Sequence, residues 1–217
     1  MWQLAGSTVQ WQSGNVHGSF SPSQPSLGVR LSQSDACLFA LALDGQAIPP
    51  GGEHYIRGTD LFVDCPADER LIRIQTYYRD LIGPVPGIEL VISVQTKELD
   101  VSTKLQVVTK LPGHLQQHDD RKKLPPSPTD PSRIECERNV FRWRDNIGQI
   151  SGVQFVHPSD FISAQSDGQT LCCDLFPEPL ENGVIRRGRV RCYITSEERM
   201  LDRLYQEFLD TPLPLTT

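Results

Sequence analysis

The sequence lacks the short motifs of the common nucleotide-binding and hydrolytic enzymes. Its 217 residues contain no Gly-x-Ser-x-Gly nucleophile elbow and no Gly-x-x-x-x-Gly-Lys phosphate loop. The alternation of strands and helices that positions both motifs in α/β folds is also missing. We therefore predict no catalytic residue and no cofactor, and a non-enzymatic role is the favoured interpretation.

Long apolar segments are missing as well. The longest apolar run, 36–43, has 8 residues, whereas a helix that spans a bilayer needs about 20. The N-terminal segment MWQLAGSTVQW has neither the basic start nor the apolar centre of a secretory signal. The sequence therefore predicts a soluble, cytoplasmic protein without a membrane span.

The chain has no excess of basic charge. Lys and Arg number 21 against 27 Asp and Glu, which gives a net charge of −6. A general attraction to phosphates needs a basic surface, so we expect no nucleic-acid partner. All lysines lie at or before Lys123, and the only cationic residues beyond it, histidines aside, are therefore arginines.

Residues with metal-binding spacing are scarce. The six cysteines form no Cys-x-x-Cys pair, and the adjacent Cys172 and Cys173 would point to opposite faces of a strand. Because no export signal is present, we expect free thiols. His114 and His118 would share a face only in a helix, and the nearby prolines favour a loop. No metal site is predicted.

Two alternating segments joined by a Gly- and Pro-rich stretch give the strongest structural signal. In 71–79 and 88–96 apolar residues recur at every second position, which is the period of a strand and not of a helix. The predicted inward set is Ile72, Ile74, Thr76, Tyr78, Ile88, Leu90, Ile92 and Val94. The opposite face, whose mixture of signs is typical of a solvent-exposed surface, carries Arg73, Arg79, Glu89 and Gln95.

Further short strands are predicted on both sides of this pair. Their ranges are 8–12, 27–32, 36–43, 46–48, 61–64, 140–144, 153–156, 161–165, 170–174 and 189–194. Both central residues of a type I′ hairpin turn have positive φ, which Asn, Asp and Gly adopt most easily. Hairpin turns are therefore predicted at Asp44-Gly45, Asp167-Gly168 and Asn182-Gly183. The predicted fold class is mainly β, an antiparallel β-sandwich-like body of one or two subdomains.

The alternation stops between 112 and 132, where five prolines accompany a mixed run of charges. We expect this segment to be a loop or linker between a β-rich N-terminal half (1–111) and a β-rich C-terminal half (133–217). Its Pro-x-x-Pro pattern at 128–131 is short and common, so a polyproline ligand is not favoured. The sequence leaves open whether the two halves share one core.

The C-terminal half ends in a predicted amphipathic helix, 196–210. Residues 195–198 (TSEE) fit a capping box. Apolar side chains recur at helical spacing and predict a stripe that docks against the β body; they are Leu201, Leu204, Tyr205 and Phe208. Pro212 prevents the helix from continuing.

Part of the C-terminal half resembles a group of uncharacterised proteins encoded by planctomycete bacteria. The resemblance lies in 156–161 (VHPSDF), 175–191 (LFPEPLENGVIRRGRVR) and the ending PLPLTT, and more weakly in YIRGTDLFV and ELVISVQT. It implies a bacterial origin. It implies no activity, because no catalytic or binding residue is assigned in that group.

Four carboxylates lie within ten residues, at Asp60, Asp64, Asp68 and Glu69. Paired carboxylates can act as acid and base, but only where they converge in space, and 66–69 is typical of a turn between strands. A small β-sandwich hydrolase or carbohydrate-active enzyme that uses carboxylates is therefore an alternative to the favoured function.

Arginines are the best candidates for recognition, since guanidinium groups match carboxylates and phosphates. The candidate binding residues are Arg142, Arg144, Arg187, Arg189 and Arg191. Arg138 and Arg142 resemble the arginine motif of PilZ domains, but the Asp-x-Ser-x-x-Gly that accompanies it does not follow. The alternative is a solvated strand face paired with nearby glutamates.

The favoured function is a non-enzymatic binding or protein-interaction module of a bacterial cytoplasmic protein. Its expected partner is another protein or a small acidic ligand that contacts the arginine-rich strands. A structural subunit of a larger assembly, joined through the helix or exposed strand edges, is a further alternative. The oligomeric state is left open.

Overall fold

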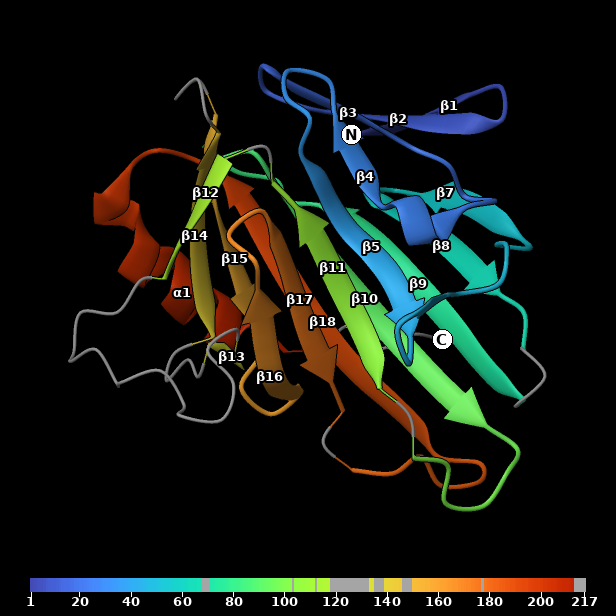
Figure 1. The fold of residues 1–217 in the computed structure, drawn as a ribbon. Helices are drawn as coiled ribbons and strands as arrows, with labels where there is room; N and C mark the ends of the chain where they lie inside the picture. The colour runs from blue at the N-terminus through green and yellow to red at the C-terminus, as the bar shows by residue number, and fades with distance from the viewer. Residues whose placement is uncertain are drawn as a thin grey trace.

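The computed structural model describes residues 1–67, 71–102, 104–111, 113–117, 133–134, 139–145, 150–176 and 178–212. Its strands form two antiparallel sheets packed face to face, with a helix on the outside of one of them (Figure 1). The mainly β, sandwich-like fold predicted from the sequence is confirmed.

Sheet A has 10 strands. In spatial order they are β1 (Trp2–Ala5), β2 (Thr8–Ser13), β3 (Val16–Phe20), β4 (Val29–Leu31), β5 (Cys37–Leu43), β11 (Leu105–Lys110), β17 (Thr170–Leu175), β16 (Phe161–Ser166) and β13 (Arg133–Ile134), with β6 (Gln46–Ala47) beside β5. A short 3-10 helix, η1 (Pro25–Leu27), leads into β4.

Sheet B has 8 strands. Their spatial order is β12 (Gly113–Gln117), β14 (Val140–Asp145), β15 (Ser151–Val156), β18 (Ile185–Ile194), β10 (Gly87–Thr96), β9 (Ile72–Asp80), β8 (Asp60–Cys65) and β7 (His54–Arg57).

Both halves of the chain contribute to both sheets. In sheet A, β11 of the N-terminal half lies between β5 and β17, and in sheet B, β10 pairs along its length with β18. Side chains from Trp2 to Ile194 form one buried hydrophobic cluster between the sheets. The two halves therefore share a single core.

The alternation in β9 and β10 places their apolar side chains in this core. None of the eight predicted inward residues is more than 2% exposed. Burial of one large apolar side chain stabilises the fold by about 1.5–3 kcal/mol, so the period-two pattern is enough to fix which face of each strand turns inward. In β18, which contains the predicted strand range 189–194, Val190, Cys192 and Ile194 belong to the same cluster.

The C-terminal helix begins later than predicted. A 3-10 turn, η2 (Glu198–Met200), precedes α1 (Leu201–Asp210). The Thr195 hydroxyl accepts from the Glu197 N–H at 3.1 Å and makes a local turn, so the capping box is wrong. The apolar stripe is confirmed, because Leu201, Leu204 and Phe208 are buried against sheet B.

The prediction of a loop or linker over 112–132 is wrong at 113–117, because these residues form strand β12, which pairs with β14. These five residues precede the cluster of prolines, and a strand at a sheet edge needs only one neighbour. His114 therefore lies on a strand and not on a helix. His118 and the remainder of the predicted linker, 118–132, lie outside the described residues.

One of the three predicted turns has the expected geometry. Asp44 and Gly45 both have positive φ, 52° and 79°, between β5 and β6. In the β16–β17 hairpin the Asp167 carboxylate instead accepts from the N–H groups of Gln169 and Thr170, and the loop is longer. Asn182 lies beside Thr96 in a connection to β18 and makes no hairpin.

The five cysteines that the structure describes are free thiols, as predicted. Cys136 lies outside the described residues. No helix in the described part of the chain has the length and apolar character needed to cross a membrane.

Candidate functional site

The outer face of sheet B, turned away from sheet A, carries polar side chains in rows because neighbouring strands are in register. The row called here the charged row alternates in sign and consists of Arg57, Asp60, Arg79, Glu89 and Arg191. The next row, called the aromatic row, consists of Tyr55, Phe62, Tyr77, Val91 and Arg189.

Ion pairs hold the charged row together. Arg79 donates two hydrogen bonds to Asp60, at 2.9 and 2.8 Å, and lies 3.7 Å from Glu89. Arg191 donates from Nε and Nη2 to one Glu89 oxygen at 2.9 and 2.6 Å, and from Nη1 to the Tyr193 hydroxyl at 3.2 Å. Glu89 is only 1% exposed, and pairing with Arg191 compensates part of the loss of its hydration. The expectation of a solvent-exposed face is therefore wrong at Glu89.

The aromatic row is a packed ladder of rings at the β7 edge of the sheet. The ring centroids of Tyr55 and Phe62 are 4.7 Å apart, and those of Phe62 and Tyr77 are 5.0 Å apart. Tyr55 is 41% exposed. Burial raises the pKa of Tyr77, and the charges of Arg187 and Arg57 oppose that shift. Arg57, in the charged row, and Arg187, which lies opposite Ser93 on β10, stand in the rows on either side of Tyr77.

Arg189, at the far end of the aromatic row, is only 2% exposed. Its Nε and Nη1 atoms have no hydrogen-bond partner among the described residues. Burial lowers the pKa of its guanidinium. The ring of Phe208 covers it, with the ring centroid 4.6 Å from the Arg189 guanidinium carbon and 5.1 Å from that of Arg191.

The helix α1 covers one end of this face (Figure 1). Its buried side chains join a second hydrophobic cluster on the outside of sheet B, made with Val85, Val140, Val153, Phe155 and Tyr193. The Phe155 and Phe208 centroids are 5.8 Å apart. The apolar stripe of α1 therefore packs on the sheet of its own chain.

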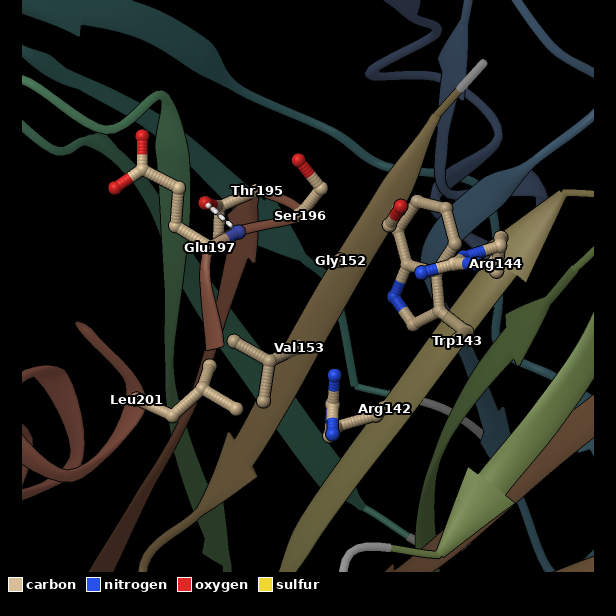
Figure 2. A pocket seen from close by; sticks show the side chains of 10 residues that line it. Arg142, Trp143, Arg144, Gly152, Val153, Thr195, Ser196, Glu197 and Leu201 are labelled. Atoms are coloured by element: carbon tan, nitrogen blue, oxygen red, sulfur yellow. Dashed lines mark hydrogen bonds between the residues drawn. The ribbon is translucent and has the colours of Figure 1, made fainter. Parts of the chain in front are cut away.

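Two of the predicted arginines lie beside the start of α1. Figure 2 shows Arg142 on β14 beside Val153 of β15, with Arg144 further along β14 beside Trp143; Leu201 of α1 lines the same depression. The depression that they line has a volume of about 20 Å³, which is room for about one water molecule. Arg187 is half-buried. The five predicted arginines thus share one sheet face but not one pocket.

A hollow of about 590 Å³ adjoins this depression. The two share Ser151, Thr195, Ser196 and Glu197. The remaining lining comes from the β2–β3 turn, the loop before β10 and neighbouring segments: Asn15, Val16, Gln33, Pro84, Val85, Pro86, Ile150 and Ile194. The volume is in the range of small-molecule sites, but none of the predicted arginines lines it.

Gly152 of β15 has no side chain, and this allows the ring of Trp143 to pack against the backbone of β15. A Cβ at position 152 would lie 2.4 Å from Cζ2 of Trp143 and 2.7 Å from the Tyr193 carbonyl oxygen. We expect Gly152→Ala to lower the free energy of unfolding by about 1–3 kcal/mol through overpacking, measured by urea denaturation. The control is Gly83→Ala, whose Cβ meets nothing within 4 Å. Equal losses in both variants would contradict the packing explanation.

The carboxylates singled out in the sequence are bound by arginines. Arg79 binds Asp60, and Arg73 donates to Asp64 at 2.8 Å. Neither carboxylate lines the depression or the hollow. Asp68 and Glu69 lie outside the described residues.

A polar cluster that sequence reasoning missed lies in the turn between β15 and β16. The Ser159 hydroxyl donates to Asp160 at 2.8 Å and lies 2.7 Å from Nδ1 of His157. Asp160 also accepts from the Arg189 backbone N–H at 3.2 Å. Burial raises the pKa of Asp160 and lowers that of His157. These bonds hold the turn against β18, which gives the cluster a structural role.

Comparisons with known proteins leave the family open. No protein-family model matches the chain, and no curated protein matches it. The fold is similar to a solved structure titled "Crystal Structure Analysis of HI1317", with 10% sequence identity, a TM-score of 0.48, and coverage of 89% of this chain and 97% of that chain. A similarity at this level carries no conclusion about function.

Proposed function

We propose that the protein is a non-enzymatic interaction module of the bacterial cytoplasm that binds an acidic segment of a partner protein. The proposed contact is the tyrosine–arginine surface, defined as Tyr55, Arg57, Tyr77 and Arg187. The observation that carries the proposal is that two packed tyrosines, and two arginines without an ion-pair partner among the described residues, lie on one face of sheet B in a chain with net charge −6.

The arginines of this surface differ from their neighbours in charge pairing. Arg73, Arg79 and Arg186 each bind a carboxylate at 2.7–2.8 Å. Within the described residues, Arg57 and Arg187 have no carboxylate at ion-pair distance. The Nε atom of Arg187 is also buried without a partner in that part of the chain. Carboxylates of another chain would satisfy these donors.

The tyrosines give the surface a rigid apolar component. Tyrosine and arginine are enriched among the residues that dominate binding energy at protein interfaces. Strand pairing and ring contacts fix Tyr55 and Tyr77 before a partner arrives, so little side-chain freedom is lost on binding. The helix α1 packs beside β15 and does not extend to β7 (Figure 1).

Replacing Arg57 and Arg187 together by glutamine tests the proposal. The probe is a fluorescein-labelled peptide of alternating Glu and Phe, titrated by fluorescence anisotropy at low salt. We expect the double variant to bind at least about tenfold more weakly than the wild type. The difference should shrink as salt screens the exposed charges.

The matched control removes the same charge from α1, where Arg199 and Arg203 are exposed. Arg199→Gln with Arg203→Gln should bind the peptide within about twofold of the wild type, because a uniform effect of net charge is small beside a direct contact. Equal weakening in both double variants, or no saturable binding by the wild type, would overturn the proposal.

A further inference from the structure

We infer that α1 occupies a second docking position on the outer face of sheet B, and that the partner's acidic segment carries an aromatic side chain that takes the place of Phe208. The inference rests on the proposed function, because it specifies the partner's chemistry and shows how the chain restricts access to its own site.

The helix presents an aromatic ring next to a carboxylate to two arginines. Phe208 is fully buried over Arg189 and Arg191, where ring and guanidinium attract each other. The preceding residue, Glu207, is 57% exposed and lies 4.0 Å from Nη1 of Arg191. The sheet therefore already recognises, within its own chain, an acidic residue followed by an aromatic one.

The helix leaves Arg189 incompletely satisfied. Two of its guanidinium nitrogens are buried without a hydrogen-bond partner among the described residues, and buried donors in this state are unfavourable. Glu207 contacts Arg191 and not Arg189. A partner that places a carboxylate beside Arg189 would satisfy donors that α1 covers without pairing, and so can compete with the helix.

The position under α1 continues the tyrosine–arginine surface. Arg189 stands two residues from Arg187 on β18, and it ends the row that begins at Tyr55. Release of α1 would uncover Arg189, Arg191 and Tyr193 without any change in strand pairing. One extended partner segment could then cover both positions.

The helix is suited to reversible release. It has 10 residues, and helices of this length are marginal in water without tertiary contacts. Its docking depends on Leu201, Leu204 and Phe208, so it can open locally while the core between the sheets stays folded. The apparent affinity for a partner is then the intrinsic affinity multiplied by the fraction of molecules in which α1 is undocked.

The test compares variants that loosen α1. Phe208→Ala and Leu204→Ala should each bind the Glu–Phe peptide at least about tenfold more tightly than the wild type. Leu204 is a second, independent variant because it belongs to the apolar cluster under α1, whereas the ring over Arg189 and Arg191 is that of Phe208. The destabilised control is Val9→Ala, a buried site in sheet A, which should bind like the wild type.

A second peptide, with alanine in place of each phenylalanine, tests the aromatic requirement. Its gain in affinity between the wild type and Phe208→Ala should be several-fold smaller than that of the Glu–Phe peptide, because it brings carboxylates but no ring to the uncovered arginines. On addition of the Glu–Phe peptide to the wild type, amide hydrogen exchange in 201–210 should accelerate while β10 stays protected.

Three results would overturn the inference: unchanged or weaker binding by both α1 variants, equal gains with the alanine peptide, or unchanged protection of 201–210 in the complex. If any of these accompanies a selective loss in the Arg57 and Arg187 double variant, the proposed function stands and only the role of α1 falls.

Discussion

Glu89→Ala is expected to lower the free energy of unfolding by about 3–5 kcal/mol. Glu89 and Arg191 are 1% and 3% exposed, and two of the three hydrogen bonds that the Arg191 side chain donates to described residues go to this carboxylate. Removing the carboxylate leaves a buried guanidinium whose remaining carboxylate neighbour, Glu207, is 4.0 Å away and 57% exposed, and a buried charge without a close partner is strongly destabilising. Urea denaturation monitored by tryptophan fluorescence measures the loss.

Two comparisons show whether burial is the cause. Glu178→Ala removes a partner from Arg186 at a similar distance, 2.7 Å, but with a glutamate that is 66% exposed, and should change stability by at most about 1 kcal/mol. Glu89→Leu combined with Arg191→Met removes both charges and should recover most of the loss. A loss in the double variant as large as in Glu89→Ala would contradict this explanation.

Phe208→Ala is expected to lower the free energy of unfolding by about 3–5 kcal/mol, the usual effect of truncating a buried phenylalanine. The ring contacts Phe155, and it stacks over Arg189 and Arg191. Its removal leaves a cavity beneath α1 and takes the aromatic face away from two buried cations. Thermal unfolding gives the total loss, and hydrogen exchange in 201–210 shows the local part.

The control for this prediction is Gln206→Ala on the exposed side of the same helix. Gln206 makes one side-chain hydrogen bond, to Asp210 at 2.9 Å, at an exposed position, so its removal should change stability by no more than about 0.5 kcal/mol. If both variants lost similar stability, helix propensity and not the buried ring would be the cause.

The parts of the fold that the sequence predicted are those set by local periodicity. The inward residues of β9 and β10 and the stripe of α1 each follow from a repeat that only one type of element can bury. Strand β11 was missed because Val108 interrupts its alternation of Leu105, Val107 and Thr109. Strand β12 was not predicted because its residues lie between Pro112 and the prolines of 125–131, and proline disfavours strands.

The candidate site was only partly predictable. The arginines of β18 were identified from their spacing, but their burial depends on Glu89, which is 102 residues away from Arg191 in the chain. No local pattern reveals that pairing. Tyr55 and Arg57 were not predicted, although the sequence contains a signal for their hairpin: HYIR and DLFVD flank the turn residue Gly58. In the structure Gly58 has a φ of +61° between β7 and β8.

The interleaving of the two halves governs how the chain acquires its fold. Neither sheet can be completed from residues 1–111 or from 133–217 alone, since β11 needs β17 and β10 needs β18. Contacts between such distant residues close large loops, which slows folding. A break of the backbone within 118–132 would therefore produce two fragments that reach the native structure only by associating with each other.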